Sequence, residues 1–442
     1  MTGQLLDRQE WRQHGWIVLP SLVGMILIGV SPYTLGVMIT PLEQEFGWSR
    51  AAISSGLLIP AFGSLVLAPL VGRAVDRFGS RPVALLGVPF FCAALASLSL
   101  AGPGIYSWLA LYALVGVATM FIFPHIWAAA ISRRFVRNRG IALAIALAGT
   151  GVASAVMPFV TSLLVVTTGW RGAYVGIGVL CFAVAFPIVF LLFEPGTKKG
   201  RGQTEPKPFE PAPRKPVPWT DLTSLRFLKL VAATFFFSLC ACALTTNVVP
   251  ILMAEGFDLV TSAKIAGLVG LGTIIGRLGG GILLDRINGR FVAMGTCAAP
   301  LMGVAALLAT HQAPEAAMFA CFAIGLSAGA EYDAAAYLSG RYFSLENYGF
   351  LFGIVASLTL IGAAIAPVVS NFVFDVTRSY DLVLWGMFPV FLLAGFLFLM
   401  LGRYPETAPL DAGEESDAFA AGHAAPLKVH VPLWTCLSSD RG

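Results

Sequence analysis

Charged side chains are scarce in this sequence: Asp, Glu, Lys and Arg make up 12% of its 442 residues, against 57% hydrophobic residues. Soluble domains carry about 25% charged residues, so the composition excludes an ordinary soluble protein. Segments of about ten residues with alternating polarity are also lacking, which argues against a β-barrel. Apolar runs of about 20 residues recur instead, each long enough to cross a hydrocarbon layer as a helix. The sequence therefore predicts an all-α protein that crosses a membrane many times.

Motifs of catalysis and cofactor binding are missing as well. The seven cysteines show neither metal-binding nor disulfide spacing. No phosphate-binding Gly-Lys-Ser/Thr loop is present, which argues against transport driven by a nucleotide on this chain, and neither HExxH nor Gly-x-Ser-x-Gly occurs. We therefore expect no enzyme activity, no cofactor, no metal and no nucleic-acid partner.

The apolar runs and the basic residues together predict the topology. If the chain starts in the cytoplasm, tails and loops on that side carry 23 of the 28 Lys and Arg residues, and loops on the other side carry four. Cytoplasmic loops are the basic ones, so both termini are predicted to be cytoplasmic in a plasma or inner membrane. The twelve expected spans are 16–39, 51–71, 82–101, 105–131, 141–166, 171–193, 227–253, 263–284, 291–309, 315–339, 349–373 and 381–402.

A proline-rich, charged segment at 194–226 divides six spans from six and has the composition of a solvated linker. The halves are 16–193 and 227–402, flanked by tails 1–15 and 403–442. They repeat each other: the pattern Gly-x-x-x-Asp-Arg ends in Asp76-Arg77 in one and in Asp285-Arg286 in the other, 209 positions apart. Such repeats predict two pseudo-symmetric six-helix bundles with a transport site between them, in one chain that works as a monomer.

The loop "GRAVDRFGSRP" at 72–82 resembles the signature loop of the major facilitator superfamily, Gly-x-x-x-Asp-Arg-x-Gly-Arg-Lys/Arg, with Ser80 as a departure. We expect Asp76 to end one helix and Arg77 and Arg81 to begin the next. The resemblance implies that these residues, with Asp285 and Arg286, act as a conformational latch, here called the loop latch. Simple anchoring by cytoplasmic positive charge is the alternative.

A second resemblance covers residues 15–403. "FVRNRGIALAIALAGTG" at 135–151 is similar to the fifth-span signature of monocarboxylate transporters. "EFGWSRAAIS" at 45–54, "GWRGAYV" at 169–175 and "YDAAAYLSGRYF" at 332–343 resemble the bacterial branch that includes oxalate–formate exchangers.

Departures from these relatives bear on the substrate. Gly36 and Thr273 stand where animal monocarboxylate transporters carry a lysine and an acid, and span 349–373 lacks the lysine of oxalate exchangers. A single cation suits a monoanion better than a dianion.

Away from the span ends, four ionisable residues fall deep inside predicted spans: His125, Arg277, Glu331 and Asp333. Such residues usually face the bundle interior or a wet cavity. Three of them (Glu331 is the exception) lie eight residues from a charged helix end, which places them at one depth, ~12 Å in. The guanidinium of Arg277 fits a carboxylate bidentately, and the resemblance assigns it to the substrate. A structural pair with Glu331 or Asp333 is the alternative.

Glu331 and Asp333 lie about 200° apart around a helix, so they face different sides. Asp333 shares a face with Tyr337, which predicts an acid–phenol pair in a polar cavity. Asp333 either couples transport to protons or forms a structural ion pair, whereas Glu331 is predicted to brace its helix against a partner from the eighth or eleventh span. Its carboxylate is a second candidate for proton coupling.

Three further polar residues complete the predicted substrate site. His125 titrates near physiological pH, so it is a candidate for substrate or proton binding, and a helix–helix hydrogen bond is the equal alternative. Tyr33 and Asn247 fall in the first and seventh spans, which line the central cavity in the superfamily. Each either donates to a substrate carboxylate or packs between helices.

The sequence therefore predicts a secondary transporter that moves a small organic anion, monocarboxylate-like, through the lipid bilayer by alternating access with proton symport. Two alternatives stay open. One is a transporter of the same fold that exchanges dicarboxylates or exports drug-like compounds. The other is a membrane sensor or scaffold that transports nothing.

Overall fold

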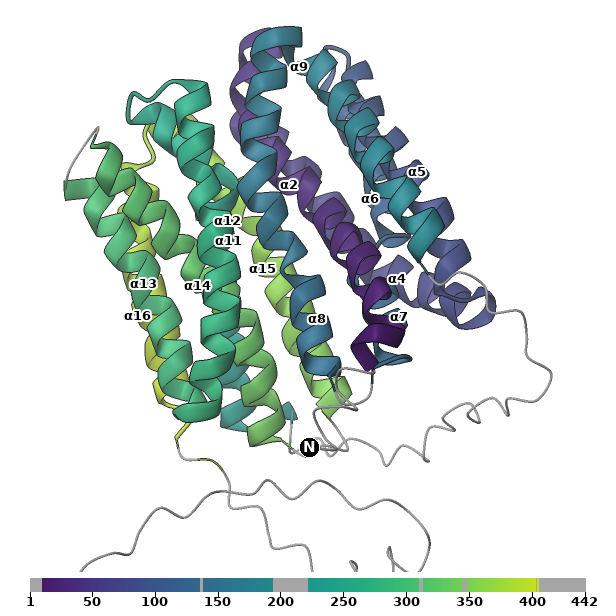
Figure 1. Ribbon diagram of the computed structural model, residues 1–442. Coiled ribbons are helices and arrows are strands. Elements are labelled where there is room, and N and C mark those ends of the chain that lie inside the picture. The colour runs from purple at the N-terminus through teal and green to yellow at the C-terminus, as the bar shows by residue number, and fades with distance from the viewer. Residues whose placement is uncertain are drawn as a thin grey trace, which may run out of the picture. The chain divides into compact units, whose positions relative to one another are not determined.

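Residues 10–135, 138–193, 222–309, 313–343, 348–402 and 404 are described by the computed structural model, and their regular structure is entirely helical (Figure 1). The chain divides into two units, Met1–Gly402 and Arg403–Gly442, and every helix lies in the first. The predicted all-helical membrane protein is confirmed. The predicted linker and C-terminal tail fall almost wholly outside the described residues.

The described residues form eight α-helices in the first half of the chain. They are α2 (Val18–Phe46), α3 (Arg50–Ser54), α4 (Leu58–Phe78), α5 (Ser80–Ser97), α6 (Ile105–Met120), α7 (Pro124–Ser132), α8 (Arg139–Leu147) and α9 (Gly149–Leu192). The second half forms six: α11 (Leu225–Ala254), α12 (Leu259–Arg286), α13 (Gly289–Ala309), α14 (Pro314–Tyr342), α15 (Tyr348–Thr377) and α16 (Asp381–Leu399). Short 3-10 turns precede α2 and α4 and follow α5.

Ten helical stretches among the described residues are long and apolar enough to cross a membrane. One of them, Arg139–Leu192, has 54 residues and bends at Gly169, whose φ of 70° and ψ of 173° are not helical. The predicted spans 141–166 and 171–193 are thus joined in one assigned helix. α14 is not among the ten, although its 29 residues are long enough, because its sequence includes polar and charged residues.

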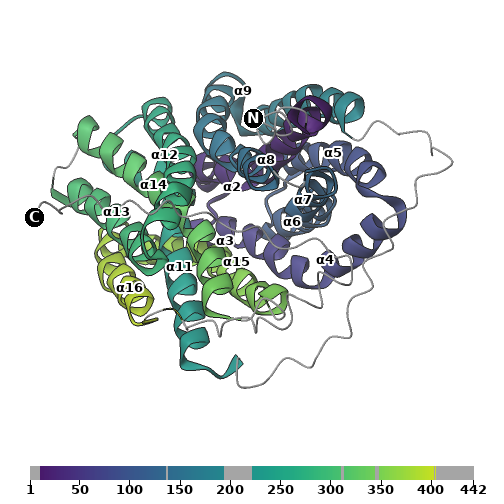
Figure 2. The ribbon, with the colours of Figure 1, turned by 60° about the horizontal axis from the view of Figure 1, so that its bottom comes forward.

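Helices α2–α9 gather on one side of the first unit and α11–α16 on the other, as the colours of Figures 1 and 2 show. The two groups meet where α2 packs on α11, α9 on α12, and α3 and α4 on α15. Along the α9–α12 contact both helices carry glycine: a Cβ on Gly270 would collide with Gly151 and Ala155, and one on Gly267 with Ala155. Small residues let backbones approach this closely in lipid.

Inside the second group, α12 and α14 form the closest helix pair. Gly272, Gly276 and Gly280 recur every four residues and share one face of α12, while Gly325 and Gly329 do the same on α14. A Cβ on Gly329 would lie 2.8 Å from the backbone nitrogen of Arg277. These glycines form a close contact, here called the α12–α14 seam, which holds the backbone of α14 directly against that of Arg277.

The start of α12 is fixed by Asp258, which lies outside the spans. Its side chain accepts hydrogen bonds from the backbone N–H groups of Val260 and Thr261, both at 3.0 Å, as an N-cap does. Hydrogen bonding from the side chain and then the backbone of Thr261 lowers the pKa of Asp258.

Replacing Gly276 with valine is expected to destabilise the protein by about 1–3 kcal/mol, because overpacking forces helices apart. A Cβ at this position would lie 2.9 Å from Leu326 Cα. Gly279→Val on the same helix is the matched control, since a Cβ there meets nothing within 4 Å. Thermal unfolding of the detergent-solubilised variants measures the difference, and equal losses at both positions would contradict the tight seam.

Candidate functional site

A partly buried ion pair between α12 and α14 is the centre of the candidate site. Arg277 Nε lies 3.4 Å from Asp333 Oδ2, and the two side chains are 10% and 29% exposed. The pair is incomplete, because Nε and Nη1 of Arg277 are buried and make no hydrogen bond. A buried cation normally has all its donors satisfied, so this guanidinium has capacity for another anion.

A cavity of about 250 Å³ lies where α2, α4, α6, α11 and α15 meet, and both halves of the chain line it. Tyr33 of α2 is in its wall, and the Tyr33 hydroxyl interacts electrostatically with Arg277 of the second half. Arg277 itself is not a lining residue of this cavity. The other hydroxyls of the wall are those of Ser31, Ser64, Thr119, Thr245 and Thr246.

Glu331 lies on a different side of α14 from Asp333. It is 5% exposed, and its Oε1 is buried without a hydrogen-bond partner. Within the part of the chain described, no hydrogen bond or ion pair joins it to the eighth or eleventh span, so its role in bracing the helix stays a prediction. Its electrostatic neighbours on the packed helices are instead two thiols, Cys242 of α11 and Cys297 of α13.

Tyr337 does not form the predicted pair with Asp333. Its ring packs on Gly289 at the start of α13, and the guanidinium of Arg341 lies 5.9 Å from the ring centroid. Among the described residues, no hydrogen bond joins it to Asp333. Tyr337 lies one helical turn after Asp333, nearer to the end of α14 at Tyr342.

Asn247 is fully buried between helices, and its amide is occupied. Its Nδ2 donates to Ala243 O at 3.0 Å and to Ser370 Oγ at 2.7 Å, and its Oδ1 accepts from Asn371 at 2.9 Å. This is the helix-packing role that the sequence left as an alternative. In this conformation the side chain has no free donor for a substrate.

His125 lies at the start of α7, just after a break in the predicted span 105–131. The chain is non-helical at Phe121–Phe123, before Pro124, because proline disfavours helical geometry in the residue ahead of it. The imidazole is half-buried and packs on Phe123, with ring centroids 5.6 Å apart.

The loop latch is only partly described. Asp76 and Arg77 both lie in the last turn of α4, so the prediction that Arg77 begins the next helix was wrong; Gly79, at φ 87°, separates the two helices. The side chain of Asp76 is outside the described part. Arg81 Nη2 donates to Phe190 O at 3.0 Å within the first half, and Asp285 and Arg286 are exposed at the end of α12.

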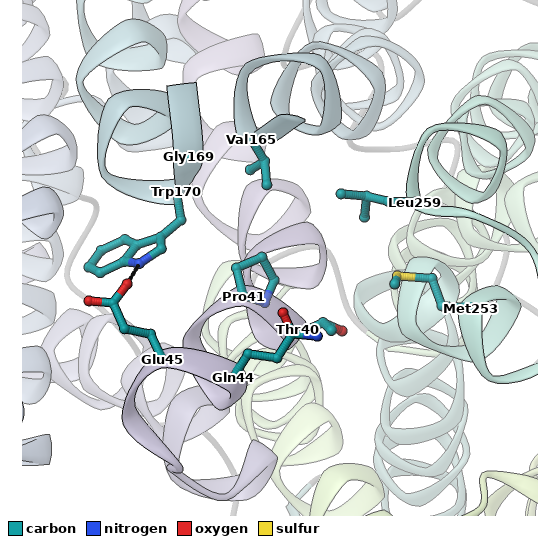
Figure 3. A pocket seen from close by; sticks show the side chains of 9 residues that line it. All are labelled: Thr40, Pro41, Gln44, Glu45, Val165, Gly169, Trp170, Met253 and Leu259. Carbon is teal, nitrogen blue, oxygen red and sulfur yellow. Dashed lines mark hydrogen bonds between the residues drawn. The ribbon is translucent and has the colours of Figure 1, made fainter. Parts of the chain in front are cut away.

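A second, larger cavity of about 450 Å³ lies at the end of the bundle where α2 finishes (Figure 3). Its wall combines α2, α9, α11 and α12. Glu45 closes one side, where it accepts a hydrogen bond from the indole of Trp170 and pairs with Arg171. Among its lining residues only Thr40, Gln44 and Glu45 have polar side chains apart from the indole of Trp170, and none is a lysine or an arginine.

A network of polar residues at this same end was missed by the sequence analysis. It joins Arg50 and Ser54 of α3 to Asn371 and Asp375 of α15, and Tyr380 beside them. Asn371 inside the predicted span 349–373 was the available signal, since a buried amide in lipid requires partners.

Comparison with known proteins identifies the class. The family model "Major Facilitator Superfamily" matches residues 21–332 and 300–441. The chain therefore belongs to the major facilitator superfamily of multi-pass membrane proteins, and it is a secondary transporter rather than an enzyme. The predicted resemblance is confirmed.

Relatives of known name include monocarboxylate transporters. Monocarboxylate transporter 13 of Rattus norvegicus is 24% identical over 88% of this chain and 90% of its own length. Monocarboxylate transporter 4 of Rattus norvegicus is 31% identical over 45% of this chain and 42% of its own length. A gallate transporter of Pseudomonas putida is 24% identical over 64% of this chain and 68% of its own length.

Among solved structures, a bacterial homologue of the human lysosomal transporter Spinster, in an inward-facing and occupied conformation, superposes with a TM-score of 0.67. It shares 16% identity and covers 89% of this chain and 98% of its own. At this identity the likeness concerns the fold.

Proposed function

We propose that this transporter carries a small organic monoanion together with a proton, by alternating access between two six-helix bundles at 16–193 and 227–402. Counting the bend at Gly169 as a reversal and α14 as a span gives twelve crossings, with both termini in the cytoplasm of a plasma or inner membrane. The carboxylate relatives support the substrate class. The alternatives are a dicarboxylate exchanger, an exporter of drug-like compounds, and a sensor without transport.

The observation that carries the proposal is the incompletely satisfied guanidinium of Arg277. Its ion pair with Asp333 neutralises the charge but leaves two buried nitrogens without hydrogen bonds. Arg277 lies outside the cavity wall in this conformation, so a substrate carboxylate completes these bonds in a state of the transport cycle in which the cavity extends to α12, with the Tyr33 hydroxyl as a neutral donor from the first half. Because Asp333 already neutralises Arg277, a monoanion adds one unpaired negative charge to the site and a dianion adds two, so the monoanion costs less to bind.

The proton is assigned to Glu331. Asp333 has a counter-charge in Arg277, whereas Glu331 is buried without an ion-pair partner among the described residues, and an unpaired charge in such surroundings costs several kcal/mol. Glu331 is therefore neutral while the bundle is closed around it. His125, half-buried at the break before α7, is a second candidate for proton or substrate contact.

Uptake by the purified protein in proteoliposomes tests the function. The panel contains pyruvate, lactate, benzoate, gallate and oxalate, each with and without an acidic exterior, and benzamide as a neutral analogue. We expect uptake of monocarboxylates, stimulated by the pH gradient, and none of benzamide. Uptake confined to oxalate, or equal uptake of benzamide, would favour the alternatives.

A further inference from the structure

Asp375, near the end of α15, binds the first turn of α3 in the other half of the chain. Its Oδ1 accepts from the backbone N–H of Arg50 and its Oδ2 from that of Ala51, both at 2.9 Å. Ser49 caps the same turn by accepting from Ala52 N at 3.2 Å, so the carboxylate satisfies N–H groups that this cap leaves open. Bonds from N–H groups to a carboxylate are among the stronger hydrogen bonds in proteins.

The side chain of Arg50 adds a second contact between the halves. Its guanidinium lies 3.8 Å from the ring centroid of Phe374, and its Nη1 donates to the Tyr380 hydroxyl at 3.3 Å. Its Nε pairs with Glu43 of its own half at 2.8 Å, and the side chain is only 12% exposed. A cation of the first half is thus held between aromatic groups of the second.

Asn371, one helical turn before Asp375, extends these contacts inward. Its Nδ2 donates to Ser54 Oγ at 2.6 Å, across the halves, and to Asn247 Oδ1 at 2.9 Å. The Tyr380 hydroxyl donates to its Oδ1 at 2.8 Å. Asn247 directly follows Thr245 and Thr246, which line the 250 Å³ cavity, so the inner end of the network lies next to the cavity wall.

We propose that Asp375, Arg50, Asn371 and Ser54 form an outer latch, which holds the extracytoplasmic end of the transporter shut and sets its balance between inward-open and outward-open states. The assignment of this end to the exterior rests on the proposed function and topology. Opening requires α3 to leave α15, which breaks each interhalf bond described above. Removing a latch contact therefore shifts the population toward the outward-open state.

The cavity thiol Cys242 reports the opening directly. Right-side-out vesicles are treated with a membrane-impermeant maleimide from the outside, and modification of the Cys242 peptide is followed by mass spectrometry without substrate. Asp375→Ala is expected to raise the labelling rate about tenfold or more over wild type, since the loss of even one of its two charge-assisted hydrogen bonds produces a change of this size. Asp381→Ala, an exposed carboxylate six residues away, should label like wild type.

Ser54→Ala removes one neutral interhalf bond and should give a smaller increase in the same direction. If Asp375→Ala does not fold, the labelling rate of Ser54→Ala alone tests whether these contacts hold the outer end shut. Labelling at the wild-type rate in folded Ser54→Ala and Asp375→Ala, judged by thermal unfolding, would overturn the latch. Because labelling needs no substrate, faster labelling without any carboxylate uptake contradicts the proposed function and leaves the latch standing.

Discussion

Replacing Arg277 with alanine is expected to abolish carboxylate uptake while leaving the folded protein in the membrane. Truncating one side of a buried charge pair costs 2–5 kcal/mol, so the apparent affinity for the substrate should fall on the order of 100-fold or more. The loss is larger than for an ordinary contact because Asp333 then stays in the protein as an uncompensated anion that repels the substrate. Initial rates of uptake over a range of substrate concentrations measure the effect.

Two further variants make the Arg277 result specific. Arg277→Lys keeps the charge but loses the planar fork, and we expect about a tenfold or greater weakening. Lys264→Ala removes an exposed cation from the same helix and should leave uptake unchanged. Normal uptake by Arg277→Ala would remove this residue from the site.

Replacing Glu331 with glutamine is expected to separate transport from the proton. The change is nearly isosteric and fixes a neutral side chain in the state that the buried, unpartnered carboxylate adopts in the closed bundle. Exchange of substrate across the membrane should continue, whereas accumulation driven by an acidic exterior should be lost. Uptake against a concentration gradient after a pH step is the measurement.

Asp333→Asn is the matched comparison for Glu331→Gln. It removes the counter-charge of Arg277 but keeps the Glu331 carboxyl, on which Asp333 acts only as an electrostatic neighbour, so substrate binding should change while pH-driven accumulation persists. Loss of accumulation in Asp333→Asn together with normal accumulation in Glu331→Gln would reverse the assignment of the proton.

Most helices could be predicted because apolar length alone determines which segments can span lipid. The importance of Arg277 could be predicted for a related reason. A permanently charged side chain in an apolar run is costly in a membrane, and such residues usually have a function. The close packing of the α12 glycines on α14 is a finding of the structure.

Contacts between distant segments could not be predicted. The bonds from Asp375 to Arg50 and Ala51 join residues more than 320 positions apart, and no local pattern indicates such a pairing. Tyr337 shows a related limit. Sharing a helical face with Asp333 made contact possible, but the packing of α13 against α14 decided where the ring lies.

Counterflow in proteoliposomes tests the central claim, that the protein carries organic monoanions through Arg277, most directly. Vesicles are loaded with unlabelled benzoate or pyruvate, diluted into a trace of the labelled acid, and followed without a pH gradient. We predict a transient accumulation of label in wild type that benzamide does not support and that Arg277→Ala lacks. The absence of counterflow with every monocarboxylate, or equal counterflow in Arg277→Ala, would contradict it.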